Sequence, residues 1–196
     1  MSSSTASATD TAPLRLVVII GSTRPGRFGP VVANWFTEQA RRHGGFDVDV
    51  VDLAEIGFET TEPRLTGADA LAPRLAEAEA FVVVTPEYNH SFPGPLKIAI
   101  DQYKYEWRAK PVAFVSYGGM SGGLRAVEQL RLVFAELHAM SVRNSISFAM
   151  ARKHFDKAGR PSDEPDANSA AKDMLDQLNW WALALREARA ARPYTG

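Results

Sequence analysis

Residues 14–29, LRLVVIIGSTRPGRFG, decide the fold. Their first seven residues form a nearly continuous apolar run rich in β-branched side chains, which is typical of a parallel strand that helices cover on both faces. Gly21 ends the run, and Gly29-Pro30 favours the start of a helix, because proline fits the first helical turn, where an N–H group would be unpaired anyway. A buried strand, a glycine-rich loop and a helix in this order predict one unit of an α/β fold.

The same alternation continues along the chain. Strands are expected at 46–53, 81–85, 111–116 and 142–148, helices from 29, over 67–79, from 95, from 124 and from about 169, loop at 54–66, and loop or hairpin at 158–168. Five strands alternating with five helices imply right-handed crossovers and a parallel sheet. We therefore predict an α/β, flavodoxin-like three-layer sandwich, with a five-stranded parallel sheet in the order 2-1-3-4-5 and helices on both faces.

The composition excludes several kinds of site. The chain has 196 residues, 45% apolar composition and no cysteine, which removes disulfides, thiolate nucleophiles, cysteine-bound zinc and iron–sulfur clusters. Its four histidines show no metal-ligand spacing, and we expect no metal site. With 22 basic and 23 acidic side chains the net charge is −1, so nothing favours nucleic acid or an anionic membrane as a partner.

The two ends of the chain differ from its middle. Residues 1–13 are rich in Ser, Thr and Ala and lack the basic start and apolar centre of a secretory signal, so we expect a disordered leader. Residues 192–196 are expected to be a frayed tail, which leaves 14–191 as a single domain. No segment approaches the ~20 apolar residues that span a bilayer, and we expect a cytoplasmic protein.

Three loops lie between a strand and a helix and are rich in Gly, Pro or small polar residues: 21–29, 86–94 and 117–123. In a parallel sheet the carboxyl ends of the strands share one edge, where folds of this kind bind their ligands. We therefore expect the three loops to converge on one crevice.

The first of these loops, 21–29, has the features of a phosphate site. N–H groups at a helix N-terminus bind anions, Ser22 adds a hydroxyl, and Arg24 and Arg27 add cations. The loop matches neither of two known phosphate-binding motifs. It lacks the Lys and Ser/Thr that the P-loop requires, and Thr23 stands where the dinucleotide motif has its second glycine. The loop therefore indicates a metal-free site for a mononucleotide with one phosphate. The alternative is a plain connector.

The other two loops suit a flat ring. Pro86 and Pro93 restrict the backbone between them, which then presents fixed N–H and C=O groups, although Asn89 could equally be an ordinary turn former. Gly118 and Gly119 let the backbone approach a ligand closely, because glycine has no side chain in the way.

Residues 119–123, GMSGG, also match the G-x-S-x-G nucleophile elbow of α/β-hydrolases. That fold requires an acid and then a histidine after the serine. No aspartate lies between Ser121 and His154, and His138 is expected within the helix that directly follows the serine. An esterase that uses Ser121 is kept as an alternative.

With these three loops the sequence resembles the NAD(P)H-dependent FMN reductase family of the flavodoxin-like fold, which includes azoreductases and quinone or chromate reductases. The resemblance covers about residues 14–148 and rests on GSTRPGR at 21–27, TPEYN at 85–89, PGPLK at 93–97 and SYGG at 116–119. It implies that the first loop holds the FMN phosphate, that 86–89 line the flavin ring, and that 116–119 close over its pyrimidine side and the ribityl chain. The cofactor-binding residues that it implies are Ser22, Arg24, Arg27, Phe28, Gly29, Pro86, Glu87, Tyr88, Asn89, Ser116, Tyr117, Gly118 and Gly119. It assigns no catalytic side chain and nothing beyond residue 148.

The function that this resemblance implies is an FMN-dependent oxidoreductase. Hydride would pass from NAD(P)H to FMN and on to a small-molecule electron acceptor, such as free flavin, a quinone or an azo compound, in a ping-pong reaction. The alternative is not an enzyme of this kind but a redox carrier, which would hold FMN without turning over NAD(P)H.

The aromatic residues carry two further expectations. Tyr103, Tyr105 and Trp107 cannot all point inward from the helix expected after Pro95, and together with the family's habit of oligomerising they favour a homodimer or homotetramer. Trp180 and its neighbour at 181 are expected in the core.

Overall fold

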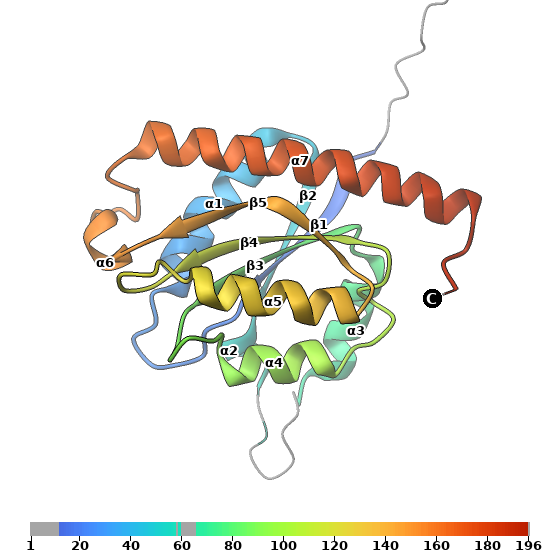
Figure 1. Ribbon diagram of the computed structural model, residues 1–196, viewed down its shortest axis with the longest axis horizontal. Helices are drawn as coiled ribbons and strands as arrows, with labels where there is room; N and C mark the ends of the chain where they lie inside the picture. Colours follow the sequence, from blue (N-terminus) through green and yellow to red (C-terminus); the bar gives the residue numbers. More distant parts are fainter. Residues whose placement is uncertain (1–11, 58, 60–65, 196) are drawn as a thin grey trace, which may run out of the picture.

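The computed structural model describes residues 12–57, 59 and 66–195, so most of the leader expected at 1–13 lies outside the described residues. Its strands form one sheet in the order β2-β1-β3-β4-β5, and every neighbouring pair is parallel (Figure 1). The predicted fold class and strand order are therefore confirmed. The strands are β1 (Leu14–Ile20), β2 (Phe46–Asp52), β3 (Ala80–Pro86), β4 (Pro111–Tyr117) and β5 (Met140–Phe148).

Helices cover both faces of the sheet, and each face has its own apolar core. Helices α1 (Gly29–His43) and α7 (Glu164–Ala191) pack on one face, while α3 (Ala68–Glu77), α4 (Gly94–Asp101) and α5 (Leu124–Glu136) pack on the other. Along β1, Leu16 and Val18 point to the first core, and Val17 and Ile19 point to the second. This alternation follows from the period of two in a strand, and it explains why a strand covered on both faces is apolar at nearly every position.

Two short helices, α2 (Leu53–Ile56) and α6 (Ala151–His154), were not predicted. The loop expected from residue 54 is wrong at its start, because the side chain of Asp52 accepts a hydrogen bond from the N–H of Ala54 at 3.0 Å and caps α2. The expected loop or hairpin at 158–168 ends early, since α7 begins at Glu164 with Pro165 in its first turn.

The helix that follows the second loop is shorter than the periodicity indicates. α4 ends at Asp101, yet Tyr103 and Trp107 are still buried, at 5% and 1% exposure. The indole N–H of Trp107 donates to the carbonyls of Ile100 and Tyr103, at 3.2 and 2.9 Å, so a side chain satisfies carbonyls at the helix end and the chain folds back. Of the three aromatic residues in this region, Tyr105 alone is exposed, at 66%.

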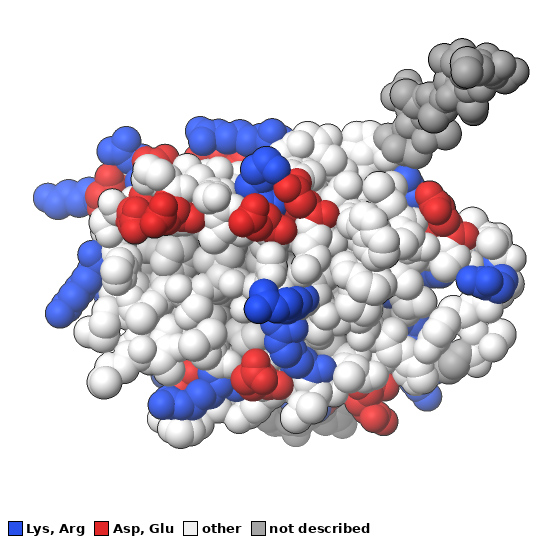
Figure 2. All heavy atoms as spheres, turned by 45° about the horizontal axis from the view of Figure 1, so that its top comes forward, with Lys and Arg blue, Asp and Glu red and all other residues white. Residues whose placement is uncertain are grey.

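The expectation that Trp180 is a core residue is wrong. Its exposure is 62%, because only one stripe of the 28-residue α7 faces the sheet. Residues at helical spacing form that stripe, and Trp180 lies off it. Figure 2, in which the α7 side is turned toward the reader by 45°, shows acidic and basic side chains interspersed on that side. The buried residues of the stripe are Ala171, Met174, Leu175, Leu178 and Ala182.

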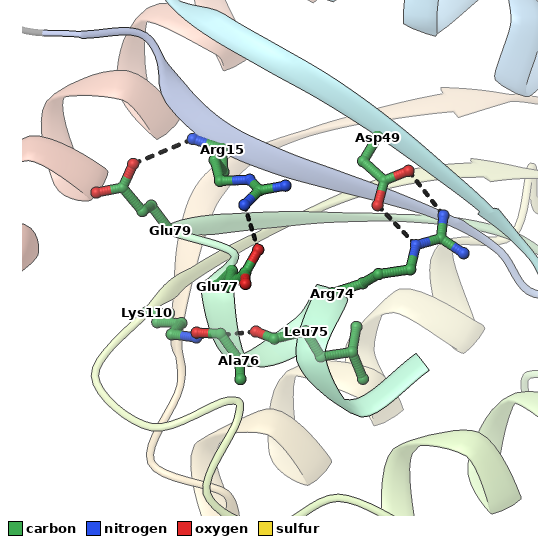
Figure 3. Close-up of polar contacts among 8 residues, drawn as sticks. All are labelled: Arg15, Asp49, Arg74, Leu75, Ala76, Glu77, Glu79 and Lys110. Atoms are coloured by element: carbon green, nitrogen blue, oxygen red, sulfur yellow. Dashed lines mark hydrogen bonds and ion pairs between the residues drawn. The ribbon is translucent and has the colours of Figure 1, made fainter. Parts of the chain in front are cut away.

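Polar contacts join α3 to the middle of β2 and to Lys110, the residue before β4 (Figure 3). Arg74 makes two hydrogen bonds of 2.8 and 2.7 Å to the carboxylate of Asp49. The ammonium group of Lys110, a buried residue, donates to the carbonyls of Leu75 and Ala76 at 2.9 and 2.8 Å and so caps the end of α3. Burial lowers the pKa of Lys110 to about 8.

Candidate functional site

A cavity of about 470 Å³ lies at the carboxyl ends of β1, β3, β4 and β5, the left end of the sheet in Figure 1. The three loops that the sequence singled out all contribute to its wall. The predicted site residues that line it are Arg24, Arg27, Phe28, Pro86, Glu87, Tyr88, Tyr117, Gly118 and Gly119. The predicted residues Ser22, Gly29, Asn89 and Ser116 are not among its lining residues.

Ser22 and Gly29 act beneath the cavity wall. Ser22 is fully buried, and the hydroxyl of Tyr117 donates to its Oγ at 3.1 Å. A Cβ on Gly29 would overlap the Ser22 hydroxyl and lie 2.9 Å from the Tyr117 oxygen, so only glycine fits here. Burial raises the pKa of Tyr117 to about 12, and this phenol therefore keeps its proton and donates it to Ser22.

The N-terminus of α1 lies at the end of the first loop. The residue before the helix, Phe28, makes no capping hydrogen bond with its side chain, and the first turn holds no acidic residue. Pro30 has no N–H group, and the N–H of Val31 donates to the carbonyl of Phe28 at 3.1 Å. The N–H of Gly29 and the dipole of the helix therefore remain to favour an anion. The geometry of this loop therefore suits a phosphate.

The two arginines of the loop differ in their surroundings. Arg27 makes a two-bond pair with Asp52, at 2.6 and 2.7 Å, and donates to the carbonyl of Ser22 at 3.1 Å. The guanidinium of Arg24 lies 3.7 Å above the ring of Tyr88 and is exposed. Arg27 is thus held to the end of β2, whereas Arg24 can reach an anion.

A tight turn shapes the second loop. Asn89 and His90 both have positive φ, 50° and 68°, and the N–H groups of Tyr88 and Ser91 each donate to the other residue's carbonyl, at 2.8 and 3.1 Å. Two successive left-handed residues form a turn that asparagine tolerates well. Asn89 therefore serves as a turn former that turns the chain back after Tyr88.

In the third loop the backbone itself faces the cavity. Gly119 has nothing within 4 Å of its Cβ direction, and a Cβ on Gly118 would lie 3.2 Å from the N–H nitrogen of Gly123. Ser116 is buried and donates to the carbonyl of Gly122 at 2.9 Å, so it supports the loop from below.

A fourth segment, residues 150–153, completes the wall, and the sequence analysis assigned nothing to it. The N–H groups of Met150 and Ala151 donate to the carbonyls of Gly119 and Gly118, at 2.8 and 3.3 Å. Arg152 donates to the carbonyl of Gly26 at 2.8 Å and so joins this segment to the first loop. Only the position of this segment in the predicted sheet could have indicated its role. Because β5 lies beside β4, the residues after β5 must border the third loop, which follows β4.

The serine of the hydrolase motif is not arranged for nucleophilic attack. The Ser121 hydroxyl hydrogen-bonds to the carboxylate of Glu87. His138, the next histidine along the chain, has its Nδ1 2.7 Å from the hydroxyl of Tyr194, at the other end of the sheet. Ser121 therefore has an acidic partner and not the base that the esterase alternative requires.

The comparison with protein families decides between the remaining possibilities. The family model for NADPH-dependent FMN reductases matches residues 14–153. The chain belongs to this family. The match runs through the third loop and ends at the residue that closes the cavity wall, so all four segments of the site lie inside it.

Individual relatives agree with this family assignment. An NAD(P)H-dependent FMN reductase of Schizosaccharomyces pombe is 39% identical over 56% of the chain, and the match spans 60% of that relative's own length. An NAD(P)H:quinone oxidoreductase of Solanum tuberosum is 31% identical over 88% of the chain and 95% of its own length. Among solved structures, the flavoenzyme FerB of Paracoccus denitrificans has the same fold, with a TM-score of 0.70 at 20% identity, over 87% of the chain and 98% of FerB.

The cavity has the features that FMN, the cofactor of this family, requires. It offers the N-terminus of a helix beside an exposed arginine for a phosphate, and open glycine backbone with aromatic side chains for a flat ring. No cluster of three metal-ligating side chains occurs in the described part of the chain. No helix in the described residues has the length and apolar composition that a membrane span requires.

Proposed function

We propose that this FMN reductase family member passes electrons from NAD(P)H through FMN to a small quinone-type acceptor, and that donor and acceptor use one site in turn. FMN, when bound, supplies the redox chemistry by taking a hydride from NAD(P)H and giving two electrons to the acceptor. The observation that carries the proposal is the cavity at the carboxyl edge, on which the three predicted loops converge.

The apolar part of the cavity lining favours an aromatic acceptor, and the cationic residues Arg24, Arg27, Arg152 and Lys153 line the same cavity. Phe28, Pro86, Tyr88, Tyr117 and Met150 give it an apolar and aromatic wall, which suits a quinone ring. The potato relative that aligns over most of the chain is named for quinones, which agrees with this choice.

We assign the cofactor contacts to the segments by their chemistry. Arg24 and the positive end of the α1 dipole, with the N–H of Gly29, would bind the FMN phosphate, and Ser22 would shape the loop beneath them. The backbone at 86–88 and 117–119 would bind the edge of the ring, where N–H groups stabilise developing negative charge. We expect Arg27 to hold the loop through Asp52 and to contribute less to the phosphate itself.

The absorption spectrum of the purified protein tests the cofactor assignment. A yellow protein that bleaches on anaerobic addition of NADPH, and recovers its colour with a quinone, supports the enzyme. A yellow protein that does not bleach is the redox carrier, and a colourless protein that takes up no FMN contradicts the proposal. One shared site predicts parallel lines in double-reciprocal plots when both substrates are varied.

Arg24→Ala tests the phosphate assignment. A charge-assisted hydrogen bond is worth about 1.5–3 kcal/mol, so FMN should bind at least about tenfold more weakly, measured by quenching of flavin fluorescence. Arg41→Ala is the matched control, because it removes an exposed arginine at the far end of α1. Equal FMN affinity in the two variants would contradict the assignment.

The expected homodimer or homotetramer and the cytoplasmic location stay predictions. Light scattering during size-exclusion chromatography measures the oligomeric state directly. If the exposed Tyr105 belongs to a subunit contact, Tyr105→Lys should shift the protein toward the monomer.

A further inference from the structure

Glu87 forms a charged cluster in the wall of the cavity. Glu87 is one of the lining residues, yet its side chain is only 7% exposed. Arg125, in the first turn of α5, approaches Oε1 with its guanidinium at 2.8 Å and donates its backbone N–H to Oε2 at 3.2 Å. The Ser121 hydroxyl, from the G-x-S-x-G sequence, is a third partner.

These contacts tie the two ring-facing loops together. The N–H of Glu87 donates to the carbonyl of Tyr117 at 3.1 Å, which joins the second loop to the end of β4. Ser121 comes from the third loop, and Arg125 from the helix that follows it. A shift of the Glu87 side chain would therefore move both loops that face the cavity.

The cluster also balances charge at this wall. Burial favours the neutral form of Glu87, but hydrogen bonds from Ser121 and Arg125 together with the charge of Arg125 outweigh burial and hold the pKa of this carboxyl below its ordinary value. Glu87 is thus ionised at neutral pH, and Arg125, itself half exposed, supplies the compensating positive charge.

We propose that Arg125 is a positioning residue that holds and neutralises the Glu87 carboxylate beside the cavity, and so sets the reduction potential of the flavin bound there. The inference rests on the proposed function. Reduction adds negative charge to the flavin, so an uncompensated carboxylate in the wall disfavours it and an uncompensated guanidinium favours it.

Opposite charge changes at the two partners test this idea. Arg125→Gln leaves the carboxylate unpaired and should lower the midpoint potential of bound FMN, with reduced FMN bound roughly tenfold more weakly relative to oxidised FMN. Glu87→Gln leaves the guanidinium unpaired and should shift the potential upward. The double variant removes both charges and should return near the wild-type value, whereas Arg42→Gln, in an exposed pair on α1, should leave the potential unchanged.

The sign of the shifts separates this role from a merely structural one. Loosened loops would move the potential in the same direction in both single variants, and that result, or no shift in either, overturns the inference. Ser121→Ala is the second variant in case a charge change prevents folding, and it should give a smaller shift of the same sign as Arg125→Gln. Arg125→Lys should partly restore the wild-type potential. Failure of the wild-type protein to bind FMN would instead refute the proposed function.

Discussion

Gly29→Ala should damage the fold and the phosphate loop together. The new Cβ would overlap the Ser22 hydroxyl and lie 2.9 Å from the Tyr117 oxygen and 3.0 Å from a methyl carbon of Ile20, all in buried surroundings. Overpacking of this kind costs about 1–3 kcal/mol. The displaced hydrogen bond between Tyr117 and Ser22 adds about 1 kcal/mol. The free energy of unfolding should therefore fall by about 2–4 kcal/mol.

Urea denaturation followed by circular dichroism measures this loss, and a flavin titration measures the accompanying loss of FMN affinity. At about 2–4 °C per kcal/mol for a chain of this size, the melting temperature should fall by roughly 4–16 °C. Gly94→Ala is the matched control. Gly94 also begins a helix, α4, but nothing lies within 4 Å of its Cβ direction, so alanine should be neutral or stabilising by up to about 1 kcal/mol. If Gly29→Ala is as stable as Gly94→Ala, the close packing of Gly29 on Ser22 is refuted.

Three further changes test the packing and the charges. Burial lowers the pKa of Lys110 from 10.5 to about 8, so between pH 8 and 10.5 the unfolded chain binds this proton more tightly than the folded protein does. The stability of the wild type relative to Lys110→Met, measured by urea titration, should therefore rise with pH across this window. A stability difference that does not change with pH would argue against the pKa shift. Asp52→Asn breaks a largely buried pair and should cost about 1–3 kcal/mol, whereas Asp49→Asn, in a more exposed pair that also has two hydrogen bonds, should cost less than about 1 kcal/mol. Trp107→Ala should cost about 3–5 kcal/mol by calorimetry, and Tyr105→Ala should stay within about 0.5 kcal/mol; equal losses would contradict the burial described here.

Local patterns were sufficient for the sheet and for most of the cavity wall. A strand buried on both faces must be apolar at nearly every position, so LRLVVII at 14–20 and FVVVT at 81–85 indicate parallel strands without any knowledge of their partners. The three loops followed from the same logic, because parallel strands bring their carboxyl ends to one edge. The sequence therefore predicts residues 86–88 and 117–119 at the edge where they line the cavity.

Prediction failed where a residue's role depends on a partner far along the chain. Trp180 looked like a core residue because an indole is usually buried, but the side of α7 that faces the sheet is set by the packing of the whole helix. The segment 150–153 carries no motif, and it reaches the cavity through hydrogen bonds to Gly118 and Gly119.

The sequence by itself determined the α/β architecture, the order of its elements and the three loops at one edge, because hydrophobic periodicity and glycine-rich turns are properties of neighbouring residues. Only the tertiary structure decided which charges are available at that edge. Arg24 and Arg27 are alike in sequence, yet Asp52, 25 residues from Arg27, holds one guanidinium while the other lies over Tyr88. Ser121 likewise became a partner of Glu87 once folding brought two loops together. The pairing of charges depends on distances in space, and those distances exist only after the sheet has formed.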